Sequence, residues 1–120
     1  VCGDKVTIKA KFNDDHIEDI KVHSSGCAIS VASGSMLAEL LPGKSFDEVL
    51  KISSAFRELM HGKEMPEDID YGDLDALEGV QKYHVRIKCA LLAWVTLQDL
   101  IKSWQENISA GSPSTTENKE

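Results

Sequence analysis

The first part of the chain alternates between hydrophobic and polar positions, as a strand with one buried face does. The alternation begins after Asp4 and continues for eight residues. One face carries Val6, Ile8, Ala10 and Phe12, and the other carries Lys5, Thr7, Lys9 and Lys11. The pattern therefore predicts a half-buried strand.

Residues 13–15 read Asn-Asp-Asp, a composition typical of a tight turn. Residues 16–23 then predict a second strand, on which Ile20 and Val22 share a face with Glu18. The two strands form an antiparallel hairpin in this interpretation. Because two strands alone are marginally stable, helices or a further strand must cover one face.

Hydrophobic residues next recur at helical spacing, and Pro42-Gly43 ends that pattern. The first turns after Cys27 consist mostly of Ala, Ser and Gly, which let another backbone come close. The sequence thus predicts a buried helix. Its hydrophobic positions are Ile29, Ala32, Met36, Leu37, Leu40 and Leu41.

A second helix is predicted to start at Ser45, because Ser45 and Glu48 have the spacing of a capping box. Gly62 ends it, and the acidic residues 63–73 predict a loop. The inner stripe of this helix is Phe46, Val49, Ser53, Phe56 and Met60.

Asp73 can cap a short helical piece that Gly79 closes. The last helix is predicted from about residue 83 to 107. Residues 109–120 are rich in Gly, Ser, Pro, Thr and Glu and predict a disordered polar tail, so we expect one domain over residues 1–108. Two strands followed by helices indicate the α+β class, a small antiparallel sheet packed against several helices.

The composition and net charge argue against nucleic-acid-binding and membrane proteins. The chain has 120 residues, 42% of them hydrophobic, and a net charge of −7. The negative charge argues against nucleic acid as a partner and suits a partly basic protein. No hydrophobic run approaches membrane-spanning length and no signal peptide is evident, so we expect no membrane partner and a cytoplasmic location.

The chain has three cysteines, an odd and scattered set that does not suit a secreted disulfide framework. Three buried apolar cysteines would be a common arrangement and remain one interpretation. Metal binding is the other. Cys27 lies at a predicted helix start, where the free N–H groups favour a thiolate, and Cys89 lies near another beside Arg86 and Lys88.

Cys2 and Asp4 are two residues apart in an extended segment, so their side chains leave the same face. With Cys27 and Cys89 they would supply three thiolates and one carboxylate, a full tetrahedral set that zinc or iron accepts. The spacing matches no zinc-finger pattern. Metal binding therefore stays a hypothesis on spacing alone.

Three segments together resemble the SufU branch of the IscU/NifU N-terminal family of iron–sulfur cluster assembly proteins. They are Cys2-Gly3-Asp4, the run from Ser25-Gly26-Cys27 to Ser35, and Arg86-Ile87-Lys88-Cys89-Ala90, with Gly43-Lys44-Ser45 between them. IscU-type scaffolds have His where this chain has Lys88. The stretch between Cys27 and Cys89 is also longer here, and both features resemble SufU.

The resemblance implies a SufE/NifU-like fold and zinc held by Cys2, Asp4, Cys27 and Cys89. It also implies a PLP-dependent cysteine desulfurase of the SufS type as partner, besides other cluster assembly proteins. In the family's mechanism a histidine of the desulfurase replaces the first cysteine on zinc, and the released thiolate attacks the partner's persulfide. Cys2 would be the sulfur acceptor of a sulfurtransferase-like activator that is not a stand-alone enzyme, and Arg86 a supporting charge.

Two other functions stay open. The same four ligands could hold iron or build a [2Fe–2S] cluster, which would make the chain a scaffold. Alternatively, the metal could be purely structural, in an adaptor without sulfur chemistry. We expect the four histidines to be surface or loop residues and not ligands, and His23 and His84 are the two that could lie near the metal.

Overall fold

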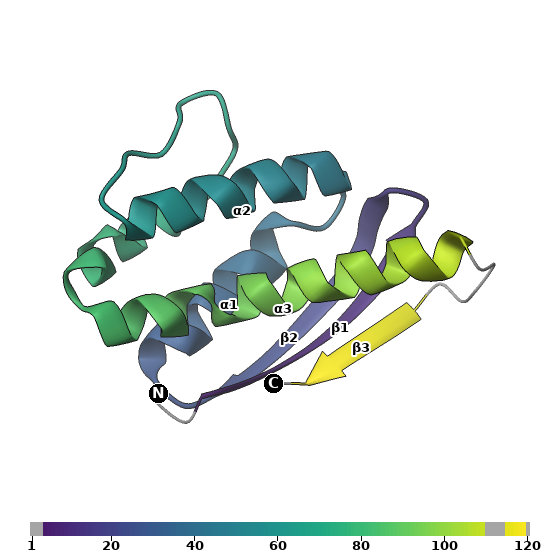
Figure 1. The fold of residues 1–120 in the computed structure, drawn as a ribbon, viewed down its shortest axis with the longest axis horizontal. Coiled ribbons are helices and arrows are strands. Elements are labelled where there is room, and N and C mark those ends of the chain that lie inside the picture. The colour runs from purple at the N-terminus through teal and green to yellow at the C-terminus, as the bar shows by residue number, and fades with distance from the viewer. Residues whose placement is uncertain (1–3, 110–114, 120) are drawn as a thin grey trace.

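The structure is a computed structural model that describes residues 4–109 and 115–119. A three-stranded antiparallel sheet has the order β2-β1-β3 and is packed against helices. Figure 1 shows α3 running across the sheet, with α1 beside it and α2 farther from the strands. The predicted α+β class is confirmed. The elements are β1 Lys5–Asn13, β2 His16–Ser25, α1 Ala28–Leu40, α2 Phe46–Met60, the 3₁₀ helix η1 Leu74–Lys82, α3 His84–Ser109 and β3 Thr115–Lys119.

Strand β1 follows its predicted alternation, and the four hydrophobic side chains from Val6 to Phe12 are buried. Strand β2 departs from it. The register steps from Lys11 opposite Asp19 to Phe12 opposite Ile17, so Glu18 is an extra residue in a bulge. We expected Glu18 to share a face with Ile20, but the bulge leaves Glu18 exposed and turns Ile17 inward with Ile20.

The prediction for the C-terminal tail was wrong at residues 115–119, which pair with β1 as strand β3. We expected disorder there because the segment is polar. An edge strand offers a row of unpaired backbone N–H and C=O groups, which pair with another extended segment whatever its side chains. The other residues of the expected tail beyond Ser109 lie outside the described ranges.

Helix α1 buries small polar residues on its inner face. Ser30, Ser33 and Gly34 are almost fully buried there together with Leu37. A Cβ on Gly34 would come within 2.7 Å of the Ser24 hydroxyl oxygen, so the helix lies directly on β2. This close approach confirms the expectation from the small-residue run.

Helix α2 begins with the predicted capping box, in which the Ser45 hydroxyl accepts from the Glu48 N–H and the Glu48 carboxylate accepts from the Ser45 N–H. All five residues of its predicted inner stripe are buried. The short helical piece η1 differs from expectation. It continues past Gly79 to Lys82, and Asp73 makes no side-chain cap bond.

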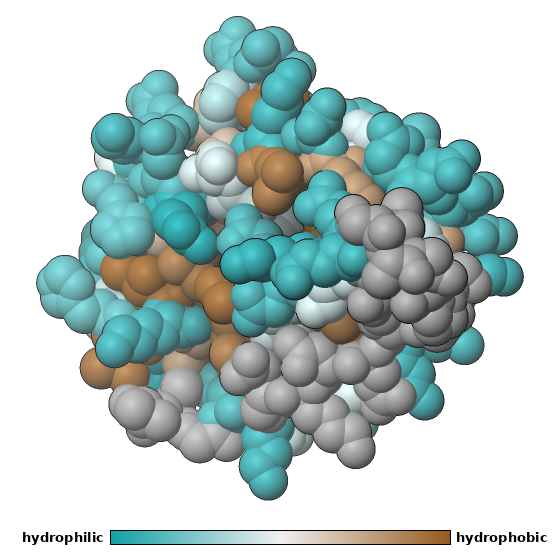
Figure 2. All heavy atoms as spheres, turned by 45° about the vertical axis from the view of Figure 1, so that its right-hand side comes forward, coloured by the Kyte–Doolittle hydropathy of each residue, from teal (hydrophilic) through white to brown (hydrophobic). Residues whose placement is uncertain are grey.

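The core lies between the sheet and the helices. Trp94 and Trp104 of α3 are both buried, as their stripe predicted. Phe12 of β1 packs edge-on against Phe46 of α2 and also contacts Trp104. The face turned to the viewer in Figure 2 is largely hydrophilic, with hydrophobic residues showing in patches between hydrophilic ones.

Candidate metal centre

Three of the four predicted ligands come together at one end of the sheet. Asp4 directly precedes β1, Cys27 is the N-cap residue of α1, and Cys89 lies in the second turn of α3. One ligand atom from each lies within 4.8 Å of the others. The fourth predicted ligand, Cys2, lies outside the described residues.

The hairpin brings Asp4 to Cys27. Lys5 pairs with Ser25 at the open end of β1 and β2, so the residues just before β1 and just after β2 are neighbours. Gly26 connects β2 to Cys27 with φ of +121°, a conformation that side chains rarely allow. A Cβ at Gly26 would lie 2.0 Å from Asp4 Oδ1, so the carboxylate occupies the space that this glycine leaves.

The Asp4 carboxylate is fixed by α1. The backbone N–H of Cys27 donates to Asp4 Oδ1 at 2.8 Å, and the Cys27 thiol lies 3.3 Å from Oδ2 as a donor. The Ser30 hydroxyl also donates to Oδ2. These bonds place a negative charge at a helix N-terminus, where the unpaired N–H groups stabilise it.

The same contacts favour the charged form of the carboxyl group. Hydrogen bonds from Ser30 and from the backbone of Cys27 hold the pKa of Asp4 below its usual value, although partial burial acts to raise it. The Arg86 guanidinium contributes the smallest lowering of that pKa. Asp4 is therefore an anionic candidate ligand at neutral pH.

Two serines of α1 join this cluster to α3. The Ser30 oxygen lies 3.2 Å from the backbone carbonyl of Cys89, and the Ser33 hydroxyl donates to the carbonyl of Ala90 at 2.6 Å. Trp94 Nε1–H donates to the Ser33 oxygen at 3.1 Å. The turn of α3 that carries Cys89 is thus held against the turn of α1 that follows Cys27.

The donor set and its spacing fit a tetrahedral metal. Zinc–sulfur bonds of about 2.3 Å and zinc–oxygen bonds of about 2.0 Å separate neighbouring donors by about 3.5 to 3.8 Å around a tetrahedron. The 3.3 Å between Cys27 Sγ and Asp4 Oδ2 is close to that separation. Cys89 is disulfide-bonded in the structure, so it must be reduced to act as a ligand. With Cys89 reduced, small side-chain movements would bring all three described donors onto one zinc or iron ion.

The other predicted site residues surround the cluster without joining it. Arg86 and Lys88 are exposed on α3 on either side of the buried Ile87. All four histidines are exposed, as predicted, and none belongs to the group of potential ligands found among the described residues. The carboxylate is the oxygen ligand that the structure offers.

Sequence reasoning missed Ser30 as part of the site. The residue was visible only as one member of the run of small residues after Cys27. Its signal was its spacing: a residue three positions after an N-cap returns to the same side of the helix. Its burial to 1% exposure and its bonds to Asp4 distinguish it from the other serines of the run.

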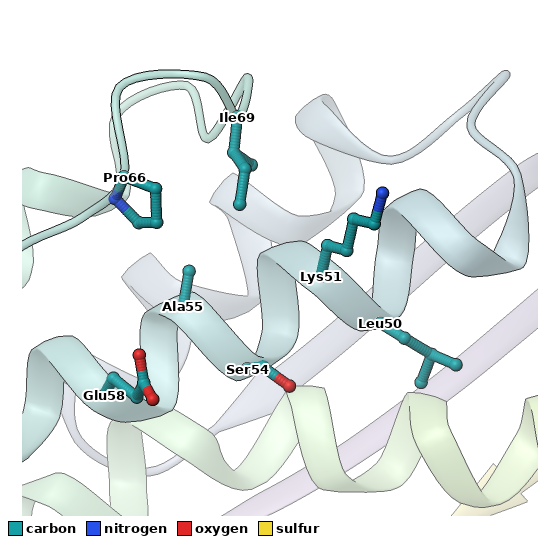
Figure 3. A pocket seen from close by; sticks show the side chains of 7 residues that line it. All are labelled: Leu50, Lys51, Ser54, Ala55, Glu58, Pro66 and Ile69. Carbon is teal, nitrogen blue, oxygen red and sulfur yellow. The ribbon is translucent and has the colours of Figure 1, made fainter.

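A shallow groove on another part of the molecule has no part in this centre. It has a volume of about 370 Å³ and lies between α2 and the acidic loop. In Figure 3, Pro66 and Ile69 from the loop stand opposite Ala55 from α2. None of the candidate ligands lines it.

None of the helices in the described ranges is both long and apolar enough to cross a bilayer. Residues 1–107 match the family model described as the NifU-like N terminal domain. The chain therefore belongs to the NifU-like N-terminal family, and its curated relatives include proteins named as iron–sulfur cluster assembly scaffolds.

Two bacterial relatives are equally similar. The zinc-dependent sulfurtransferase SufU of Bacillus subtilis is 43% identical over 81% of this chain and 66% of its own length. The iron–sulfur cluster assembly scaffold protein IscU of Streptococcus pyogenes is 43% identical over 84% of this chain and 64% of its own length. The chain thus spans about two thirds of the length of these relatives.

Solved structures agree with the fold. A putative iron–sulfur cluster assembly scaffold protein for the SUF system from Fervidobacterium islandicum superposes with a TM-score of 0.73 at 40% identity, covering 81% of this chain and 71% of that one. A NifU-like N-terminal protein from Brucella abortus gives 0.80 at 26% identity, covering 88% and 73%.

Proposed function

We propose that this chain is a zinc-dependent sulfur acceptor in iron–sulfur cluster assembly. The observation that carries the proposal is the convergence of Asp4, Cys27 and Cys89 at one end of the sheet. The similarity to a relative named as a zinc-dependent sulfurtransferase supports it. The proposed site consists of these three residues and Cys2.

Each residue has a separate task in this proposal. Asp4, Cys27 and Cys89 hold the metal, and Arg86 supports the charge of Asp4 from a distance. Zinc, when bound, would keep thiols deprotonated without redox chemistry of its own. Cys2 is the sulfur acceptor, since it precedes the first strand and does not start a helix.

Sulfur transfer then takes the ordinary route of thiol exchange. The Cys2 thiolate attacks the outer sulfur of the persulfide on a PLP-dependent cysteine desulfurase of the SufS type. The persulfide S–S bond breaks, and its electron pair leaves with the desulfurase cysteine as a thiolate. A new S–S bond on Cys2 carries the sulfur, and no oxidant or reductant is consumed.

Cytoplasmic location stays a prediction that accompanies this proposal.

The test compares the protein with Cys2→Ala for metal content and for sulfur received from the desulfurase. We expect zinc in the purified protein and transfer that Cys2→Ala abolishes while its far-UV circular dichroism stays unchanged. Full desulfurase stimulation by Cys2→Ala would show that another group accepts the sulfur.

A [2Fe–2S] scaffold is the second candidate, because one of the equally similar relatives is named a scaffold and the donor set also suits iron. Lys88 favours the first proposal, because the resemblance to the SufU branch rests in part on Lys at the position where IscU-type scaffolds have His. A stable, transferable cluster on the purified protein, together with no affinity for zinc, would reverse the order of the two.

A further inference from the structure

The start of α3 exposes hydrophobic side chains beside the candidate metal centre. Tyr83 is 62% exposed and Val85 is 55% exposed, the highest values among the large hydrophobic residues described. The Cys89 sulfur lies 3.7 Å from the Val85 carbonyl oxygen, so this turn is in direct contact with a proposed ligand. The other exposed large hydrophobics, Val31, Leu50 and Val95, are only 40 to 42% exposed.

The segment around the start of α3 carries positive charge, although the protein as a whole is acidic. The chain has 20 Asp and Glu residues, yet residues 79–98 contain none of them. Lys82, Arg86 and Lys88 are all exposed there, and none forms an ion pair with another described residue. We call the exposed side chains of residues 82–88 the α3 entry surface.

We propose that the α3 entry surface is the docking site for the cysteine desulfurase, through a patch of that partner that is both apolar and acidic. This inference rests on the proposed function. A partner that delivers sulfur at the metal centre must cover the surface next to it, and Val85 lies one helical turn before Cys89. Exposed tyrosine is favoured at interfaces because it buries a large area with few rotatable bonds.

The charge of the α3 entry surface indicates which class of partner binds there. An acidic protein patch is attracted to the three cations and repelled by much of the remaining surface, so the contact is oriented. A nucleic acid or an anionic bilayer presents negative charge over a far larger area, and it would meet the net charge of −7 as well. The groove between α2 and the acidic loop contains no residue of the α3 entry surface.

The experiment measures the dissociation constant of the zinc-loaded protein with a purified SufS-type desulfurase. Tyr83→Ser and Val85→Ser test the apolar contact, and Leu50→Ser and Val95→Ser are matched controls at exposed hydrophobic positions elsewhere. We expect the double variant Tyr83→Ser/Val85→Ser to bind at least about tenfold more weakly. The control variants should stay within about twofold of the wild type, and all variants should keep full zinc content.

A second pair of variants tests the charge. Lys82→Glu should slow association and reduce its dependence on salt, whereas Lys102→Glu, with the same charge change on an exposed position of α3, should leave both nearly unchanged. An equal loss with Lys82→Glu and Lys102→Glu would mean that only net charge matters, and it would overturn the docking site.

The outcomes separate this inference from the proposed function. If the wild type binds and stimulates the desulfurase while the Tyr83 and Val85 variants bind equally well, only the docking site is overturned. If these variants change the oligomeric state without changing desulfurase affinity, the surface joins copies of this chain and the proposal fails. If the wild type itself does not bind the desulfurase, both proposals fall.

Discussion

At the scale of single residues, Ser30 connects the candidate ligands. Its hydroxyl donates to the Asp4 carboxylate and lies close to both the Cys27 sulfur and the Cys89 carbonyl. A group that hydrogen-bonds a metal ligand fixes the orientation of that ligand and raises metal affinity. Ser30 is thus a positioning residue for Asp4 in the proposed zinc site.

Ser30→Ala is expected to weaken zinc binding by about tenfold or more, because the Asp4 carboxylate loses a charge-assisted hydrogen bond. Competition with a chromophoric chelator measures the affinity. Ser54→Ala, on the exposed side of α2, is the matched control and should bind zinc as the wild type does. Unchanged affinity in Ser30→Ala would remove the positioning role, whatever the thermal stability of the variant.

Gly26 allows a second prediction at this scale, since a Cβ there would collide with the Asp4 carboxylate. Gly26→Ala should greatly reduce zinc binding and also destabilise the fold. Gly43→Ala is the control. Gly43 also has a positive φ, of +86°, but a Cβ there meets nothing within 4 Å.

Both glycine variants are therefore strained by about 1 kcal/mol or more in their backbone, and only Gly26→Ala displaces a ligand. Urea unfolding and zinc stoichiometry of the two purified variants separate the effects. Equal zinc content in both would contradict the role given to the space at Gly26.

At the scale of elements, the capping box shows how local sequence fixes a boundary. Ser45→Ala removes the hydroxyl that accepts from the Glu48 N–H, and it should destabilise the protein by about 1 kcal/mol. Urea unfolding at neutral pH measures this loss. Ser54→Ala again serves as a control, now for the same substitution inside α2. No difference between the two variants would show that the cap contributes nothing to stability.

The capping interaction also depends on pH. Hydrogen bonds from the Ser45 N–H and hydroxyl hold the pKa of Glu48 below its usual value in the folded state. The stabilisation by the ionised Glu48 is therefore complete above the unfolded-state pKa and is lost as pH falls through the lower, folded-state pKa. The free energies of unfolding of the wild type and of Glu48→Gln should therefore differ less at about pH 3 than at pH 7, because the wild type loses the contribution of the ionised carboxylate. A constant difference across that range would contradict this linkage.

At the scale of the whole molecule, the sequence predicted those parts of the fold that are determined by local patterns. Alternation located β1, and the capping box located the start of α2. The bulge at Glu18 and the strand β3 could not be found this way, because both depend on the partner strand and not on the segment's own residues. Local periodicity carries no information about pairing.

The candidate site was predictable for a different reason. Two cysteines at predicted helix starts and a carboxylate just before a predicted strand identified three candidate residues. The resemblance to a family indicated that these residues lie close together, as they do in the structure. The contacts that hold them together were not predictable. Ser30 and Ser33 work through the close approach of α1 to α3, which follows from packing and not from spacing in the sequence.

The site joins β1, α1 and α3, so zinc should stabilise the whole fold. A ligand that binds only the folded state at 100 times its dissociation constant adds about 2.7 kcal/mol to the free energy of unfolding. We expect urea unfolding of the protein at that free zinc concentration to show this gain over the chelator-treated protein. Asp4→Asn should lose most of the gain, because the anionic ligand is gone.

Asp70→Asn is the control for that substitution, because Asp70 is an exposed carboxylate bonded to Lys44 and is not a candidate ligand. It should keep the full zinc-dependent gain. An equal gain in Asp4→Asn would mean that zinc binds elsewhere or without the carboxylate, and the three-element metal centre would then be wrong. A gain in neither variant, with a gain in the wild type, would mean that surface charge and not ligation governs the effect.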